Sequence, residues 1–441
     1  MTDGAVDGPT VAPKGPVPGG PRPAGRRFGP FGRLWASTAV SALGDGVRLT
    51  ALPLLAVSLT SDPLLISLVT VANWLPLLLA PLAGVWADLA DRRALLIGVD
   101  LMRAVAVLAL ALTVVTGAVS LPVVCAVAAV LGLGETVHIV ASQSFLPMVV
   151  DTARLAAANG RLHVAQLIFR DSAGQPLGSL AFVAGAGLPF LIDGVSFLLG
   201  VVLLCTVPRF AGQAAPGGTG PGDGPRWRTM IMDGVRLLRT DRLLVTLAVM
   251  LGTLNFFMAV TGTLEVLYVV RWLGLPEAAF GGFLAVGALG GIVGGLLNAR
   301  LADRFGTFPA ALGGMVLMGV AMLLTGLVRH PLVAAAGFAV MALGAAVYQA
   351  LTVSFRQATT PPDQLGRLNG VYRLIGTGTI PLGALAGGAA AKLVEVNVPY
   401  VAAGAGVLLL AVLVTRPVVR MGAAQRQRAG VPDGAPAETA P

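Results

Sequence analysis

The chain has 441 residues, of which 56% are hydrophobic and only 12% are charged. A soluble protein carries about twice that charged fraction, so the composition excludes an ordinary soluble domain and predicts an all-α membrane protein with many spans. The net charge of +9 does not indicate a nucleic-acid partner. Most of the positive charge lies between apolar runs or in the tails, where it favours contact with the lipid bilayer.

The first 30 residues are rich in Gly and Pro and contain no apolar run. We therefore expect residues 1–30 to form a disordered cytoplasmic tail rather than a signal peptide. Residues 417–441 have a similar composition and are expected to form a second disordered cytoplasmic tail.

Apolar runs of about 20 residues, the length that crosses a bilayer, fill the chain between these tails. Twelve spans are expected at residues 34–58, 64–87, 94–117, 120–142, 162–186, 187–207, 243–268, 278–299, 308–328, 331–353, 368–391 and 396–415. The first six form an N-terminal half at 31–208, and the last six form a C-terminal half at 243–416.

Arginines gather in the connections on one side of these spans. That side holds Arg92, Arg93, Arg154, Arg161, Arg300, Arg304, Arg356, Arg367 and the arginines between 209 and 242, whereas the other side holds only Arg271, Arg329 and Lys392. Positively charged loops stay inside, so the arginine-rich side and both termini are predicted to face the cytoplasm of the cell (inner) membrane. Termini on the same side require an even number of spans, which twelve satisfies.

The halves are joined by residues 209–242. Residues 211–225 are mostly Gly, Pro and Ala, which predicts a flexible linker. Residues 226–242 place apolar side chains on one helical face and arginines on others: Trp227, Ile231, Val235 and Leu238 against Arg228, Arg236 and Arg239. This pattern predicts an amphipathic helix on the inner leaflet, with a simple cytoplasmic connector as the alternative.

Short sequence motifs of the first half recur in the second half. Residues 84–93, a compact cluster of acids and arginines between the second and third spans, have a weaker copy at 299–306. Ser144-Phe145 recurs 210 positions later as Ser354-Phe355. We therefore predict two pseudo-symmetric six-helix bundles, with a substrate path between them near the bilayer midplane.

The duplicated loop resembles the signature between helices 2 and 3 of the major facilitator superfamily. The matching residues are Gly84, Asp88, Arg92 and Arg93 in the first copy and Asp303, Arg304 and Gly306 in the second. Further short segments resemble the branch that contains enterobactin and macrolide exporters. They lie at residues 34–35, 41–45, 51–54, 76 and 151–159. The resemblance implies a secondary transporter.

The resemblance also implies that these seven residues form a conformational latch. Gly84 would let helices approach closely, and Asp88 would face the N-terminus of the eleventh helix near Arg367, where unpaired N–H groups favour negative charge. Arg92 and Arg93 would add ionic contacts, and the latch would favour the outward-open state. Topogenic charge at a simple turn is the alternative. The segment 174–179 retains part of the Gly-Pro motif of exporters, with a Pro kink as the alternative.

Charged residues inside spans normally face a cavity or a partner, because burying a charge in a membrane is costly. Asp45, near the middle of the first span, is the first candidate for proton or substrate binding. Arg48 lies on the same face at a spacing that permits an ion pair, so a static pair is the alternative. Glu135 is the second proton-coupling candidate, with His138 on a neighbouring part of its face and Arg170 as a counter-charge.

Other polar residues have plainer interpretations. A structural pair of Arg170 with Asp171 is the alternative to its pairing with Glu135, and Asp100 and Arg103 are expected to form another structural pair. Asp193 is expected to be solvated near the outer end of its span. Three uncharged residues in the seventh and tenth spans are further cavity candidates: Asn255, Tyr348 and Gln349.

Nothing in the sequence indicates catalysis. The two cysteines and three histidines lack metal-ligand spacing, and no phosphate-binding loop is present. We therefore expect neither an enzyme, a metal nor a cofactor. Gly-x-x-x-Gly matches are interpreted as tight helix packing within a monomer.

The sequence predicts a carrier that exports an amphipathic small molecule in exchange for protons, by alternating access. Uptake of a nutrient or siderophore is one alternative. A non-transporting receptor or scaffold on the same fold is another, but the buried charges disfavour it.

Overall fold

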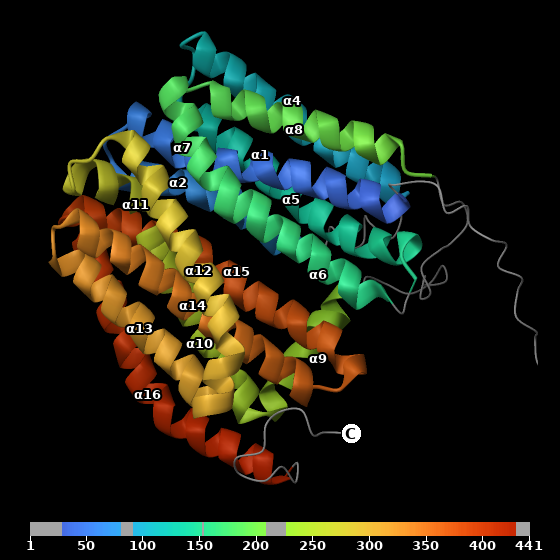
Figure 1. Cartoon of the computed structure of the whole chain (residues 1–441), viewed down its shortest axis with the longest axis vertical. Helices are drawn as coiled ribbons and strands as arrows, with labels where there is room; N and C mark the ends of the chain where they lie inside the picture. The colour runs from blue at the N-terminus through green and yellow to red at the C-terminus, as the bar shows by residue number, and fades with distance from the viewer. Residues whose placement is uncertain (1–28, 81–90, 152–153, 209–225, 429–441) are drawn as a thin grey trace, which may run out of the picture.

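The computed structural model describes residues 29–80, 91–151, 154–208 and 226–428. Every regular element within these ranges is a helix. The helices form two groups, stacked along the longest axis of the molecule (Figure 1), with the N-terminal group above and the C-terminal group below.

The N-terminal bundle contains the first helices of the chain. These are α1 (Pro30–Leu59), α2 (Pro63–Trp74) continued by η1 (Leu75–Leu79), α4 (Arg92–Val115), α5 (Leu121–Val149), α6 (Leu155–Ala165), η3 (Gln166–Gly174), α7 (Gln175–Ala184) and α8 (Leu188–Cys205). Asp62 caps α2 by accepting from the Leu64 N–H, and Asp91 caps α4 in the same way. Such caps satisfy N–H groups that have no partner within the helix.

The C-terminal bundle follows the connecting helix α9 (Arg226–Thr240). It comprises α10 (Arg242–Gly262), α11 (Glu265–Leu267), η4 (Tyr268–Trp272), α12 (Glu277–Phe305), α13 (Thr307–Leu327), α14 (Pro331–Thr359), α15 (Pro362–Leu393) and α16 (Val398–Arg428). Asp241 caps α10 by accepting from the Leu243 N–H.

The predicted layout of twelve membrane helices in two bundles is confirmed. In the described part of the chain, ten helices are long and apolar enough to cross a membrane. A shorter apolar run, Pro63–Leu79, ends where the described residues stop. Helices α6 and α7, with the π-helix η3 between them, form one continuous helix over 155–184. This helix supplies the remaining span.

Two predictions about the flanking segments have different outcomes. The helix predicted after the linker is present as α9, with Leu238 buried, Val235 half-buried, and Arg236 and Arg239 exposed. Its contact with a leaflet stays a prediction. The second tail was predicted to begin at 417, but α16 continues to Arg428, because this stretch is rich in Ala, Gln and Arg, which favour helix. Residues 1–28 and 211–225 lie outside the described ranges.

The segment with the Gly-Pro motif packs against α1. A β-carbon on Gly174 would lie 2.7 Å from the carbonyl oxygen of Leu43 and 2.9 Å from the Cα of Gly46, so only glycine fits this crossing. The π-helix η3 ends just before Pro176, which has no N–H to continue the hydrogen-bond ladder. This contact supports a packing role for the motif.

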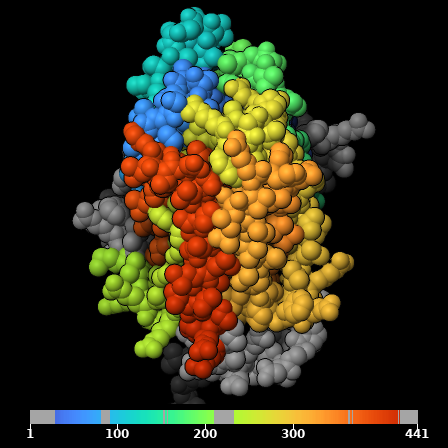
Figure 2. Space-filling view, turned by 90° about the vertical axis from the view of Figure 1, so that its left-hand side faces the viewer, coloured from blue at the N-terminus to red at the C-terminus, as the bar shows by residue number. Residues whose placement is uncertain are grey.

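The molecule has two ends, the terminus side and the Asp62 side. The terminus side is on the right of Figure 1, where α1 begins and where α6 and α9 lie. The Asp62 side, on the left, carries the turn between α1 and α2. Figure 2 views the Asp62 side, where segments of the N-terminal bundle lie directly against segments of the C-terminal bundle.

Candidate functional site

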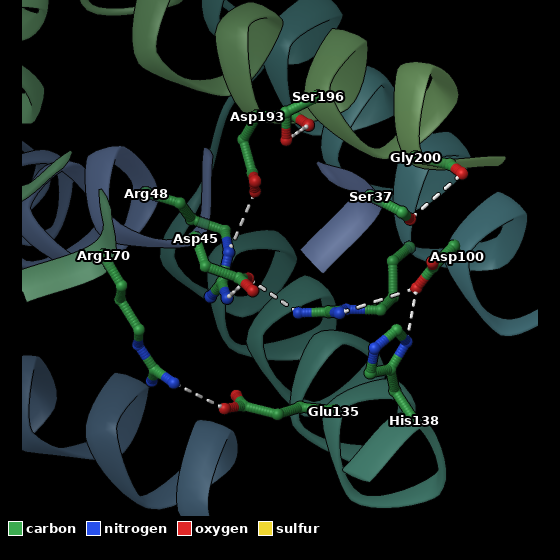
Figure 3. Close-up of polar contacts among 11 residues, drawn as sticks. Ser37, Asp45, Arg48, Asp100, Glu135, His138, Arg170, Asp193, Ser196 and Gly200 are labelled. Carbon is green, nitrogen blue, oxygen red and sulfur yellow. Dashed lines mark hydrogen bonds and ion pairs between the residues drawn. The ribbon is translucent and has the colours of Figure 1, made fainter. Parts of the chain in front are cut away.

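A network of buried charges occupies the N-terminal bundle (Figure 3). Its centre is Asp45 on α1, whose Oδ1 accepts hydrogen bonds from Arg48 at 2.7 Å and from Arg103 of α4 at 2.6 Å. Arg48 is completely buried, and Arg103 is 2% exposed. Two guanidiniums on one carboxylate oxygen hold Asp45 in its ionised form.

A second carboxylate reaches this centre from α8. Asp193 Oδ2 lies 2.9 Å from Arg48 Nε, an ion pair whose N–H is not aimed well enough at the oxygen to count as a hydrogen bond. The side chain of Asp193 is completely buried, so the prediction that water solvates it is wrong. The reason is that α8 crosses α1 at Gly44, where a β-carbon would lie 2.7 Å from Asp193 Oδ1.

Two further pairs surround the centre. The Arg103 guanidinium lies 3.8 Å from Asp100, as the sequence predicts, and also 4.1 Å from the ring centre of Phe197. His138 Nδ1 lies 2.9 Å from Asp100 Oδ1, so His138 pairs with α4 and does not share a partner with Glu135.

Glu135 has the predicted counter-charge. Arg170 donates to Glu135 Oε1 at 3.1 Å, and it does so from the π-helical turn of η3. The side chains of Glu135, His138 and Arg170 are 13%, 20% and 23% exposed, whereas Arg48 and Asp193 have no exposed surface. The network therefore has a fully buried centre and a partly exposed rim.

The network contains one carboxylate more than guanidiniums. Its carboxylates are Asp45, Asp100, Glu135 and Asp193, and its guanidiniums are Arg48, Arg103 and Arg170. His138 is the remaining titratable group. Counted over these groups alone, the network is electrically neutral when one proton is bound, either on His138 or on a carboxylate, and a low-dielectric interior favours that neutral state.

A polar cavity of about 650 Å³ lies between the two bundles. Its lining includes the predicted residues Asn255, Tyr348 and Gln349, together with Gln143 from the N-terminal bundle. Asp45, Arg48, Glu135 and Arg170 were also predicted to line a cavity. The lining of this cavity does not include them, and that they line a cavity stays a prediction. Each lies in the N-terminal bundle and pairs there with a residue of another helix.

Two arginines of the polar cavity were missed as site residues by the sequence interpretation. Arg356 on α14 stacks 4.2 Å from the ring centre of Tyr372, and Arg373 projects from α15. The signal was present: Arg373 lies inside the predicted eleventh span, where an unexplained charge marks a functional site. The hydroxyl of Tyr348 is buried and has no hydrogen-bond partner among the described residues.

A smaller apolar cavity of about 300 Å³ continues toward the Asp62 side. Leu52, Val69, Trp74 and Met258 contribute to its wall. Asn255 lines both cavities and donates to the carbonyl oxygen of Gly376 at 2.9 Å.

On the Asp62 side the bundles are joined by polar contacts. Lys392 of α15 pairs with Asp62 at 2.5 Å, and Arg271 donates to the carbonyl oxygens of Ser61 at 3.0 Å and Thr60 at 3.3 Å. The hydrogen bond from Lys392 lowers the pKa of Asp62 below its ordinary value of 3.8. The lining residues of the polar cavity lie toward the other end of α10, α14 and α15. The interface is therefore joined on the Asp62 side and hollow toward the terminus side.

The loop residues expected to form a latch are only partly described. Gly84 and Asp88 lie outside the described residues. Arg93 donates to the carbonyl oxygens of Leu204 and Cys205, at 3.0 and 2.7 Å. Arg93 therefore binds the C-terminus of α8 within its own bundle, because unpaired helix-terminal carbonyls attract cations.

The other described latch residues are Arg92, Asp303, Arg304 and Gly306. Arg92 contacts the sulfur of Met148 at 3.6 Å, and Asp303 and Arg304 are exposed. Gly306 has a φ of 87°, which favours glycine at this turn.

Comparisons with known proteins agree with this architecture. A profile of the family described as transmembrane secretion effector matches residues 24–435. Macrolide efflux protein A of Streptococcus pyogenes is 22% identical over 409 residues, which cover 87% of this chain and 94% of that protein. The uncharacterized MFS-type transporter YfiS of Bacillus subtilis (strain 168) is 25% identical over 406 residues, which cover 86% of this chain and 91% of that protein.

Solved structures share the fold. A bacterial homologue of the iron transporter ferroportin in its inward-facing state has a TM-score of 0.71 at 17% identity, covering 88% of this chain and 98% of that chain. A bacterial ferroportin homologue in the outward-facing state has a TM-score of 0.58 at 18% identity, covering 89% of this chain and 99% of that chain.

Proposed function

We propose that this chain, which belongs to the major facilitator superfamily of transporters, exports an amphipathic small molecule across the cell membrane in exchange for protons. Its similarity to a macrolide efflux protein supports export. The adjacent polar and apolar cavities between the bundles, which meet at Asn255, support an amphipathic cargo.

The proposed cycle is alternating access, with the described conformation open to the cytoplasm. The arginine-rich terminus side is assigned to the cytoplasm by the positive-inside rule. The polar cavity lies toward that side, and the contacts of Asp62 and Lys392 close the other. The higher TM-score to an inward-facing than to an outward-facing ferroportin homologue agrees with this assignment.

The observation that carries the proton proposal is the charge balance of the network. Four carboxylates face three guanidiniums, so one proton makes the network neutral. Asp45 is held as an anion by two arginines. Glu135 has a single arginine partner and lies at the rim, so we assign proton exchange to Glu135 and a fixed central role to Asp45.

Accumulation assays test this function. Cells with and without the gene are loaded with a labelled panel that includes a macrolide, in the presence and absence of an uncoupler. The carrier should lower accumulation of at least one compound, and the uncoupler should abolish the difference. Higher accumulation with the gene would indicate uptake, and export that survives the uncoupler would refute proton coupling.

A matched pair of variants tests the proton site. Glu135→Gln should remove uphill export while leaving downhill exchange, because glutamine cannot titrate. Glu395→Gln removes an exposed carboxylate beyond α15 and should leave export unchanged. Uphill export by a well-expressed Glu135→Gln carrier would move the proton to another group.

A further inference from the structure

The polar cavity differs from the charge network in one respect: its cations have no anions. Arg356 and Arg373 both line it and are only partly exposed. Within the described ranges, neither has a carboxylate oxygen within ion-pair distance, and Arg356 instead stacks on Tyr372. Glu135 acts on Arg373 from a distance but is paired with Arg170.

The rest of the cavity wall also favours an anion. Its polar side chains are amides, hydroxyls and phenols, including Gln143, Asn255, Gln349 and Asn369, and the described lining contains no carboxylate. The Tyr348 hydroxyl and the Arg356 Nε are buried without a hydrogen-bond partner. Both groups can donate to an oxygen of a bound acid.

The position of the arginines relative to the apolar cavity gives a bound molecule a direction. Arg373 and Ile380 are seven residues apart on α15, which is about 10 Å along a helix. Arg373 lines the polar cavity, and Ile380 lines the apolar one. A molecule with an acidic group and an apolar body about 10 Å long can therefore occupy both.

We propose that this site binds an amphipathic organic anion, with its acidic group at Arg373 and Arg356 and its apolar body directed past Asn255 toward Trp74. The proposal rests on the proposed function in taking this anion as the cargo. An unpaired cation in a membrane interior is costly, and a carboxylate or phosphate on the bound molecule removes that cost. The same chemistry is available from a free organic acid and from an anionic lipid headgroup.

Binding to the purified full chain tests the charge preference separately from transport. The probes are 2-naphthylacetate, 2-naphthylacetamide and 2-(2-naphthyl)ethylammonium, which share an aromatic body and differ in charge. Radiolabelled 2-naphthylacetate is bound to detergent-solubilised protein, and the other two compete. The acetate should bind about tenfold or more tightly than either analogue. Equal binding of all three, or no binding of the acetate to folded protein, overturns the proposal.

Substitutions locate the binding site. Arg373→Gln should weaken 2-naphthylacetate binding about tenfold or more and leave amide binding unchanged, and Arg373→Lys should restore part of the preference. The control is Arg329→Gln, since Arg329 is an exposed arginine that stacks 5.8 Å from the ring centre of Trp272, outside the cavity. An unchanged preference in a monodisperse Arg373→Gln protein overturns the proposal.

A third comparison identifies the source of the anion. Protein in nanodiscs of zwitterionic lipid is compared with protein in nanodiscs that contain phosphatidylglycerol. Competition by phosphatidylglycerol assigns the anion site to a lipid headgroup, and its absence assigns the site to a free acid; either supports anion binding at the arginines. Failure of export in cells with intact acetate binding refutes the proposed function alone, whereas proton-driven export of a neutral compound together with equal binding of the three probes refutes the anion site alone.

Discussion

Substitution of Gly388 by tryptophan tests whether the contact on the Asp62 side is a closed gate. Gly388 lies on α15, where it faces the N-terminal bundle. A β-carbon at this position would lie 2.6 Å from the hydroxyl oxygen of Ser67 and 2.9 Å from the carbonyl oxygen of Pro63, both on α2. Helix α15 can therefore accept no larger residue here while the bundles remain in contact.

The structure gives the size of the effect. Ordinary contact begins at 3.4 Å, so α15 and α2 must separate by about 0.8 Å for the first added carbon alone, and by more for the indole ring. Overpacking of this kind costs about 1–3 kcal/mol. The outward-open state does not make this contact in the proposed cycle, so its population relative to the inward-open state should rise about 5- to 150-fold.

The assay is a spin-label distance across the interface. Nitroxides are placed at Ser120 and Glu395, which are exposed on the Asp62 side in opposite bundles, after Cys125 and Cys205 are replaced. Gly388→Trp should lengthen this distance and arrest transport. Gly282→Trp is the control, because a side chain at Gly282 meets nothing within 4 Å. An unchanged distance in folded Gly388→Trp, or an equal change in the control, would refute the gate.

Three other predictions concern the Asp62 ion pair, the central carboxylate and the orientation of the chain in the membrane. The pKa of Asp62 is lowered by Lys392, so the ion pair should stabilise the closed Asp62 side fully above pH 3.8 and lose effect as pH falls through the lowered pKa. The same spin-label distance measured from pH 7 to 3 checks this, and Asp62→Asn should remove the dependence while keeping the helix cap. Asp45→Asn should destabilise the fold by about 3–5 kcal/mol, because it leaves two buried guanidiniums without their shared anion; thermal unfolding in detergent should show a much smaller loss for Glu135→Gln. Tags at both termini and within 211–225 should be protected from an impermeant external reagent in intact cells, and labelling of any of them would contradict the orientation.

The features that could be predicted from the sequence are local along the chain. Helix positions follow from apolar runs, and the pairing of Asp45 with Arg48 follows from their spacing on one helix, because residues three apart share a face. The pairing of Glu135 with Arg170 followed from their similar depth in neighbouring spans. These inferences do not require the relative rotation of helices.

The features that were missed depend on that rotation. The sequence places Asp193 near the outer end of its span, but only the crossing of α8 over α1 shows that it reaches Arg48. Likewise, His138 can face either Glu135 or Asp100, and helix packing selects Asp100. Hydropathy gives the depth of a residue and not the direction of its side chain, so interhelical partners need the fold.

The internal repeat allows corresponding positions of the two bundles to be compared. Leu133-Gly134 on α5 recurs as Leu343-Gly344 on α14, 210 positions later. The Ser-Phe pairs at 144–145 and 354–355 have the same offset, so the two helices can be aligned position by position between these matches. Within this alignment, Glu135 corresponds to Ala345 and His138 to Tyr348. Where the first copy has titratable groups, the second copy therefore has groups that do not change charge near neutral pH.

The same alignment places a charge where the first copy has none. Leu146 directly follows the first Ser-Phe pair, and Arg356 directly follows the second, so the two residues correspond. Leu146 is buried in the N-terminal bundle, whereas Arg356 lines the polar cavity. Titratable charge is thus compensated inside one bundle, and fixed positive charge faces the cavity from the other.

This division has an energetic consequence for the proposed exchange. A proton that enters and a monovalent anion that leaves both move positive charge inward, so an inside-negative membrane potential drives both movements. Each charge gains about 2.3 kcal/mol per 100 mV, so the exchange of one proton for one monovalent anion gains about twice that amount. Fixed arginines suit such a cycle, because they bind the anion without taking up the proton that drives its export. A titratable network in the other bundle can then release its proton to the cytoplasm without a change in the charge of the cargo site.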